Sequence, residues 1–300
     1  MQTTTPLNPD LGDRFTQLST HFDPEYGMLW TYSDPEGVPC FNLTFLEELI
    51  RHHNVIKNSG GRVTVNGQEH EIRYSIGASM TPGVFNLGGE ISLFRQLIRD
   101  RDRVGLLNYA TMCVDALILR IHHFDLPVTT ITLVQGDALG GGFEAVLTSD
   151  IIVAEKRSTL GFPEILFNLF PGMGAYSLLG RKVGSAMAEK IILSGKMYKA
   201  EELYEMGVID VLAENGDGEN ALYEYIRKQE RRANGYQAVQ RARHRFNPVT
   251  HQELQDITTI WVDAALKLTE KDLKVMDRLV RSQEKLFVQG QEPAQHLSAA

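Results

Sequence analysis

The segment that most constrains the fold lies in the middle of the chain. Residues 128–134 form a β-branched run that predicts a buried strand, and residues 136–142 form a turn that ends in three glycines. Residues 143–149 can form a short helix, and residues 151–154 are an apolar strand. This order of strand, glycine turn, helix and strand is typical of layered α/β proteins.

The start of the chain is predicted to lie on the surface, before the first strand of the fold. Residues 1–25 are polar, and we expect a surface extension there, with a first strand over residues 27–33. Residues 44–55 predict a helix whose capping box pairs Thr44 with Glu47.

Turn signals then define the remaining elements. Asn66-Gly67 predicts a hairpin between residues 62–65 and 70–76, because this dipeptide accepts the positive φ angles of a primed turn. Helices are expected over residues 104–123, over 200–206 and from 219 onward. The predicted division has four parts: an N-terminal extension over 1–25, an α/β core over 26–225, a helical oligomerisation region over 226–288 and a flexible tail over 289–300.

Composition narrows the class of protein. A net charge of −8 argues against general nucleic-acid binding, which depends on Lys and Arg. The chain shows no secretion signal and no run of eighteen apolar residues, so we expect a cytoplasmic protein without a membrane span. Cys40 and Cys113 are too few and too far apart for a disulfide framework, and we interpret both as buried small side chains.

Two glutamates are the candidate catalytic residues. Glu144 follows the glycine triplet at the first turn of the predicted helix, and Glu164 follows the corner Gly161-Phe162-Pro163. Apolar surroundings raise the pKa of a carboxyl group toward neutrality, which suits it to proton transfer. The glycine turn fits neither a phosphate loop nor a dinucleotide fingerprint, but its amides could form half of an oxyanion hole. An exposed or helix-capping role remains the alternative for each glutamate taken alone.

Several motifs in order resemble the crotonase (enoyl-CoA hydratase) superfamily. They are Phe85-Asn86-Leu87-Gly88-Gly89-Glu90, Gly136-Asp137-Ala138-Leu139-Gly140-Gly141-Gly142-Phe143-Glu144, Asp150-Ile151-Ile152-Val153-Ala154, Leu160-Gly161-Phe162-Pro163-Glu164-Ile165 and Pro171-Gly172-Met173-Gly174. The resemblance implies a spiral of ββα units with a C-terminal helical region, closed into a trimer. It also implies that Glu144 and Glu164 handle water and the C2 proton, while the backbone amides of Leu87 and Gly141 hold the thioester oxygen.

Departures from the common pattern point to one branch. Residues 80–89 and 166–177 are similar to the bacterial diffusible-signal-factor synthases, and the lysine that often follows the first motif near the CoA phosphates is missing. This branch implies an acyl carrier protein substrate, dehydrated from the 3-hydroxyacyl to the cis-2-enoyl thioester and then hydrolysed to a free fatty acid quorum-sensing signal. Met173, Trp261 and Leu279 match positions expected to line the acyl pocket, and a signal-sensing receptor is a further expected partner.

Other functions stay open at this point. One is an ordinary enoyl-CoA hydratase or isomerase of fatty-acid metabolism, and another is a protein-binding scaffold on the same fold. The carrier protein is acidic, so the basic stretch over residues 227–245 is a docking candidate, with Arg241 and Arg243 as test positions. A solvated helix face is its plainer interpretation. No histidine pattern marks a metal site, and no cofactor is expected; His52, His53, His122 and His123 are interpreted as surface or satisfied residues.

Overall fold

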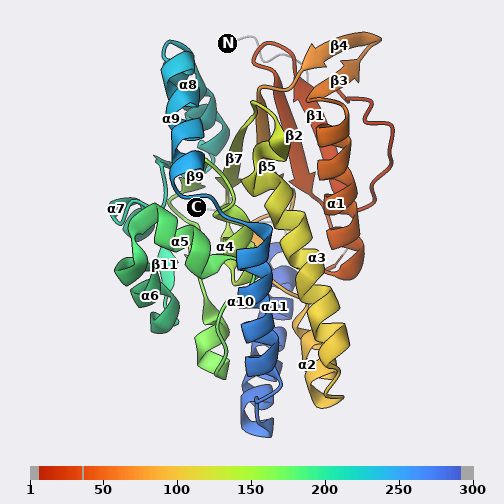
Figure 1. The fold of residues 1–300 in the computed structure, drawn as a ribbon, viewed down its shortest axis with the longest axis vertical. Coiled ribbons are helices and arrows are strands. Elements are labelled where there is room, and N and C mark those ends of the chain that lie inside the picture. The colour runs from red at the N-terminus through yellow and green to blue at the C-terminus, as the bar shows by residue number, and fades with distance from the viewer. Residues whose placement is uncertain (1–6, 36, 292–300) are drawn as a thin grey trace, which may run out of the picture.

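A computed structural model of the chain describes residues 7–35 and 37–291 (Figure 1). Its strands are β1 (Leu18–Asp23), β2 (Met28–Ser33), β3 (Arg62–Val65), β4 (Gln68–Glu71), β5 (Tyr74–Ser79), β6 (Val84–Asn86), β7 (Thr129–Val134), β8 (Asp137–Leu139), β9 (Ile151–Glu155), β10 (Thr159–Gly161), β11 (Met197–Lys199) and β12 (Val211–Ala213). Its helices are α1 (Leu43–Asn58), α2 (Ile91–Arg99), α3 (Arg103–Ile121), α4 (Gly141–Val146), α5 (Ala175–Val183), α6 (Ser185–Ser194), α7 (Ala200–Glu205), α8 (Gly218–Glu230), α9 (Ala233–Phe246), α10 (His251–Ala265) and α11 (Glu270–Gln291), with short 3-10 turns η1 (His123–Asp125) and η2 (Pro163–Phe167).

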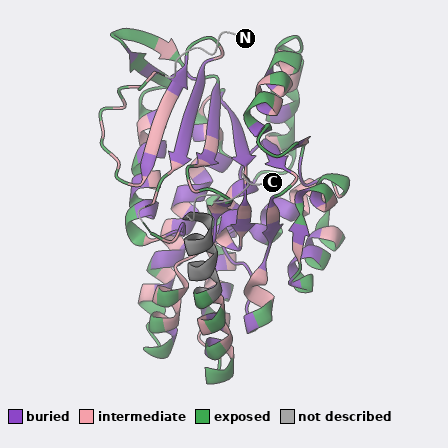
Figure 2. Cartoon of the chain, turned by 180° about the vertical axis from the view of Figure 1, so that it is seen from behind, coloured by how far each residue is buried: buried purple, intermediate pink, exposed green. Residues whose placement is uncertain are grey.

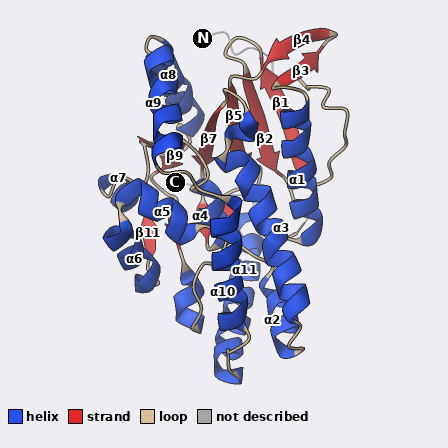
Figure 3. Cartoon of the chain, in the orientation of Figure 1, coloured by secondary structure: helices blue, strands red, loops and turns tan. Residues whose placement is uncertain are grey.

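A six-stranded sheet forms the upper part of the molecule as drawn in Figure 3. Its order is β1-β2-β5-β7-β9-β12, and every pair after the antiparallel β1 and β2 is parallel. Ile151 and Val153 of β9 pack with α8 on one face, whereas Ile152 and Ala154 join the core around α3 on the other. Both faces are therefore covered, which explains why the predicted strands are continuous apolar runs; Figure 2 shows most of this sheet as buried.

A smaller four-stranded sheet carries the glycine turn. Its order is β11-β10-β8-β6, and α4 begins directly after β8. A side chain on Gly142 would overlap the carbonyl oxygen of Asn86, so the glycine allows the start of α4 to lie against the end of β6. The first two predicted motifs, residues 85–90 and 136–144, are thereby brought into contact.

The N-terminal prediction needs correction. β1 pairs with β2 along its whole length and forms the edge of the large sheet, and Phe22 within it is fully buried. The polar residues of this segment suggested a loose extension, although Ser19, Thr20 and His21 are half-buried in the strand between the buried Leu18 and Phe22. The folded sheet thus begins at Leu18 rather than near residue 27.

Two local predictions also change. The side chain of Asn42, not that of Thr44, caps α1 by accepting a hydrogen bond from the Phe45 amide at 2.8 Å. The hairpin around Asn66 and Gly67 is confirmed, but its second strand is β4, and the residues that follow pass into the large sheet as β5.

The C-terminal helices share the core of the α/β part. Trp261 of α10 and Met276 of α11 are buried in the same cluster as α3 and α4. The boundary predicted near residue 225 falls inside α8, which covers the large sheet. Helix α11 extends to Gln291, so the predicted tail is helical at its start, and its remaining residues lie outside the described part of the chain.

Candidate active site

Glu144 lies in the first turn of α4, as the sequence predicts, with its side chain buried. Its Oε1 accepts hydrogen bonds from the backbone amides of Met173 at 2.9 Å and Ala175 at 3.0 Å. Burial raises the pKa of Glu144 to about 7, and these two N–H donors oppose the rise because they stabilise the charged form. The second glycine turn, residues 171–174, therefore orients this carboxylate.

Glu164 lies at the start of η2, where Pro163 fixes the corner before it. A Cβ on Gly140 would lie 2.5 Å from Glu164 Oε1, which places this carboxyl against the glycine turn. Its Oε2 is buried and has no hydrogen-bond partner among the described residues. Burial and the nearby charge of Glu144 raise the pKa of Glu164 to about 8.

One apolar pocket contains both glutamates. Its walls come from the loops that hold Phe41 and Gly88, from helices α2 and α3, from the second glycine turn and from α10. The lining residues are Phe41, Leu46, Leu87, Gly88, Gly89, Ile91, Phe94, Cys113, Ala116, Leu117, Gly140, Gly141, Glu144, Pro163, Glu164, Phe167, Leu169, Pro171, Gly172, Met173 and Trp261. Such a site, with few polar groups on an apolar surface, suits a fatty acyl chain that carries one reactive carbonyl.

The structure brings most of the predicted pocket residues together. Met173 and Trp261 line the pocket with the two glutamates, whereas Leu279 lies outside its lining. Leu279 belongs to α11, which packs against α2 and η2, and it is half-buried against the core. A position matched through the family therefore did not carry over here.

The two predicted oxyanion donors differ in their surroundings. The Gly141 amide opens α4, where the first N–H groups have no partner within the helix. The Leu87 amide instead donates to the carbonyl of Pro39 at 2.8 Å. The Gly89 nitrogen lies 3.5 Å from the position that a Cβ would take on Gly141, so a second amide stands near the first. The direction of these amides depends on the backbone around Gly88, whose φ is +94°, and the residue pattern alone did not reveal it.

Sequence reasoning missed part of the pocket wall. Phe94 of α2 packs on Trp261 with ring centroids 5.2 Å apart, and Cys113 of α3 lies beside the glutamates. Burial, with the charge of Glu144, raises the pKa of the Cys113 thiol, so it stays a neutral wall residue. The apolar spacing of both helices was the available signal. The interpretation of both cysteines as buried free thiols is confirmed.

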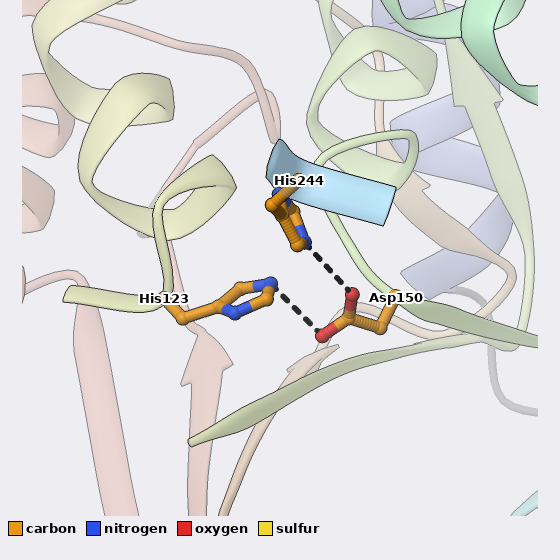
Figure 4. Close-up of side chains that lie close together, drawn as sticks. All are labelled: His123, Asp150 and His244. Atoms are coloured by element: carbon orange, nitrogen blue, oxygen red, sulfur yellow. Dashed lines mark ion pairs between the residues drawn. The ribbon is translucent and has the colours of Figure 1, made fainter. Parts of the chain in front are cut away.

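A second cluster of polar side chains lies outside this pocket. His123 of η1, Asp150 before β9 and His244 of α9 point toward one another (Figure 4). His123 is a satisfied residue, as predicted, but its partner Asp150 comes from a segment distant in the sequence. Arg243, a docking candidate, also forms an ion pair with Asp150 at 2.5 Å, and both Arg243 and Arg241 are exposed.

The comparison with known proteins decides the family. The enoyl-CoA hydratase/isomerase family model matches residues 31–272. The chain belongs to the enoyl-CoA hydratase/isomerase family. This assignment confirms the predicted crotonase-like α/β fold with a C-terminal helical region.

The relatives of this chain align with different shares of its length. The fatty acid oxidation complex subunit alpha of Idiomarina loihiensis is 36% identical over 131 residues, which span 43% of this chain and 17% of that protein. The enoyl-CoA hydratase structure from Bacillus halodurans has a TM-score of 0.71 at 20% identity, over 89% of this chain and 100% of its own. The human mitochondrial delta3-delta2-enoyl-CoA isomerase has a TM-score of 0.72 at 15% identity, over 90% and 99%. These structural likenesses show the fold.

Helix α3 is long and apolar enough to cross a membrane by length and composition. It packs instead between α1 and α10, and half of its most apolar stretch is buried in the fold. The apolar residues of α3 thus contribute to the hydrophobic core.

Proposed function

We propose that the chain performs acid–base chemistry on an acyl thioester, with Glu144 and Glu164 as the proton-transfer pair. The observation that carries this proposal is the placement of both carboxyl groups, each with a pKa raised toward neutrality, in one apolar pocket beside the Gly141 amide. Buried carboxyl groups of this kind can give or take a proton at neutral pH. The amide would stabilise an enolate oxygen, and a second donor would come from the nearby Gly89 amide, because the Leu87 amide donates to the Pro39 carbonyl.

We assign Glu164 to the C2 proton and Glu144 to the 3-hydroxyl or water, as the family resemblance implies. Because two backbone N–H groups stabilise the Glu144 carboxylate, the resting pair keeps its proton mainly on Glu164. That arrangement suits water activation by Glu144, as hydration and thioester hydrolysis require. Dehydration starts from the opposite arrangement, with the proton on Glu144 and the charge on Glu164.

The narrower proposal is a synthase of a cis-2-unsaturated fatty acid signal. The enzyme would remove water from a 3-hydroxyacyl thioester on acyl carrier protein and then hydrolyse the thioester. The motif resemblance supports this proposal, as do the two glutamates and the exposed basic residues of α8, of α9 and of the turn between them: Arg227, Lys228, Arg231, Arg232, Arg241 and Arg245. These residues offer an acidic carrier protein a positive surface. A receptor partner remains a further prediction.

Product analysis tests the proposal directly. The purified protein and its Glu144→Ala and Glu164→Ala variants are incubated with 3-hydroxydodecanoyl carrier protein and, separately, with the CoA ester, and products are identified by mass spectrometry. Free cis-2-dodecenoic acid from the unmodified protein, absent with both variants, is the expected result. A Glu164→Gln variant that still exchanges the C2 proton at the normal rate would contradict the role of Glu164.

An ordinary hydratase or isomerase is the second candidate, and the family match over residues 31–272 favours it. It predicts reversible hydration or double-bond migration of enoyl-CoA with an intact thioester. The same mass spectra separate the two functions, because only the synthase releases free acid.

A further inference from the structure

Three side chains from distant segments meet at one point beside the large sheet (Figure 4). His123 Nε2 lies 3.1 Å from Asp150 Oδ2, and His244 Nε2 lies 3.7 Å from Asp150 Oδ1. The rings of the two histidines are edge to face, with centroids 4.4 Å apart. One nitrogen or oxygen atom from each residue can thus lie within 4.8 Å of the other two.

The cluster has features of a prepared site. The Asp150 side chain is 2% exposed, and its Oδ2 accepts hydrogen bonds from the amide and hydroxyl of Thr130. His244 Nε2 is buried and faces Asp150 Oδ1 at 3.7 Å, beyond ordinary hydrogen-bond distance. The turn that presents His123 has positive φ at three consecutive residues other than glycine, His123, Phe124 and Asp125. Strained backbone of this kind is more frequent at functional sites.

We propose that His123, Asp150 and His244 bind one transition-metal ion of the Zn²⁺ class. Zn²⁺ binds imidazole nitrogen and carboxylate oxygen at about 2.0–2.2 Å, so neighbouring ligand atoms in a tetrahedral site lie roughly 3.4 Å apart. His123 Nε2 lies 3.1 Å from one carboxylate oxygen and His244 Nε2 lies 3.7 Å from the other, and one ligand atom from each residue lies within 4.8 Å of the other two, so small side-chain shifts would reach this spacing. Two imidazoles favour Zn²⁺, Co²⁺ or Ni²⁺ over Mg²⁺ and Ca²⁺, which prefer oxygen ligands. Three protein ligands leave a coordination position for water.

Arg243 competes with the ion for the carboxylate. Its guanidinium lies 2.5 Å from Asp150 Oδ1, and the side chain is 55% exposed. Metal binding therefore requires this long side chain to turn toward solvent. The ion would then fix α9, through His244, to the start of β9 and to the turn after α3.

Metal titration of tag-free protein tests the site. Co²⁺ is followed by its visible absorption, and Zn²⁺ by competition with a chromogenic chelator. We expect one equivalent per chain, with affinity at least tenfold lower in His123→Ala and in His244→Ala. Arg243→Gln should bind more tightly, because it removes the competing cation.

Two controls make the result specific. His251→Ala removes an exposed histidine that pairs with Asp115 at 2.8 Å, and Glu144→Ala alters the catalytic pocket; neither should change metal affinity. Zn²⁺ should raise the melting temperature of the unmodified protein but not that of His244→Ala.

Equal affinity in the unmodified protein and both histidine variants would overturn the proposal, as would loss of binding in His251→Ala. If the histidine variants do not fold, Arg243→Gln decides alone: unchanged or weaker binding contradicts the site. These outcomes are independent of the catalytic proposal.

Discussion

The buried carboxyl of Glu164 should make stability depend on pH. Its pKa is raised to about 8 in the folded chain from an ordinary value of 4.5. Its stabilising contribution is therefore complete below about pH 4.5 and is lost as the pH rises toward 8. Glu164→Gln should raise the free energy of unfolding at pH 8 by roughly 4 kcal/mol and have little effect at pH 4. Urea denaturation measures both, with the exposed Glu205→Gln as the control; equal pH dependence in protein and variant would contradict the prediction.

Gly142 offers a second test at the residue scale. Alanine there would overlap the Asn86 carbonyl, so the start of α4 must shift away from β6. We expect Gly142→Ala to lose about 1–3 kcal/mol of stability, as is typical of overpacking. We also expect it to lose most of its thioester turnover, because Gly141 moves with residue 142. Gly180→Ala is the matched control: it lies inside α5 with open space around it and should stabilise by about 0.5–1 kcal/mol. A fully active, stable Gly142→Ala enzyme would refute the role of this contact.

At the scale of elements, the structure assigns the N-terminal cap of α1 to a different residue from the one that the sequence predicts. Asn42→Ala removes the side chain that accepts from the Phe45 amide and bonds to Gln17. We expect a loss of about 1–2 kcal/mol for Asn42→Ala and a change within about 0.5 kcal/mol for the exposed Thr44→Ala. Chemical denaturation of the two variants gives the comparison, and a larger loss for Thr44→Ala would restore the capping box.

Elements with a strong local signal could be predicted from the sequence. The buried strands β7 and β9, the glycine turn and both glutamates were found because apolar runs and glycine corners are local patterns. The meeting of His123, Asp150 and His244 could not be predicted, since it depends on how three separate elements pack. The orientation of the Leu87 amide was hidden for a related reason: its hydrogen bond to the Pro39 carbonyl depends on how two separate loops pack.

At the scale of the whole molecule, the family resemblance predicts a homotrimer. Ile260 of α10 is 60% exposed, which is unusual for an isoleucine on a helix whose other face joins the core. Light scattering after size exclusion should give three times the chain mass of 33.7 kDa. Ile260→Glu should shift the mass toward the monomer if α10 forms the contact; a monomeric unmodified protein would exclude the trimer.

The distribution of charge over the molecule leads to the last prediction. The chain carries a net charge of −8, so the exposed arginines of α8 and α9 form a local exception, which the proposed function assigns to docking of an acidic carrier protein. Arg243 is unsuitable for the test, because it holds Asp150. Reversing Arg241 and Arg245 to Glu should raise KM for the carrier-linked substrate roughly tenfold and leave the CoA ester unchanged. Lys190→Glu, an exposed change on α6, is the control. Because salt screens exposed charges, the difference should shrink at high ionic strength; an equal effect on both substrates would place the carrier elsewhere.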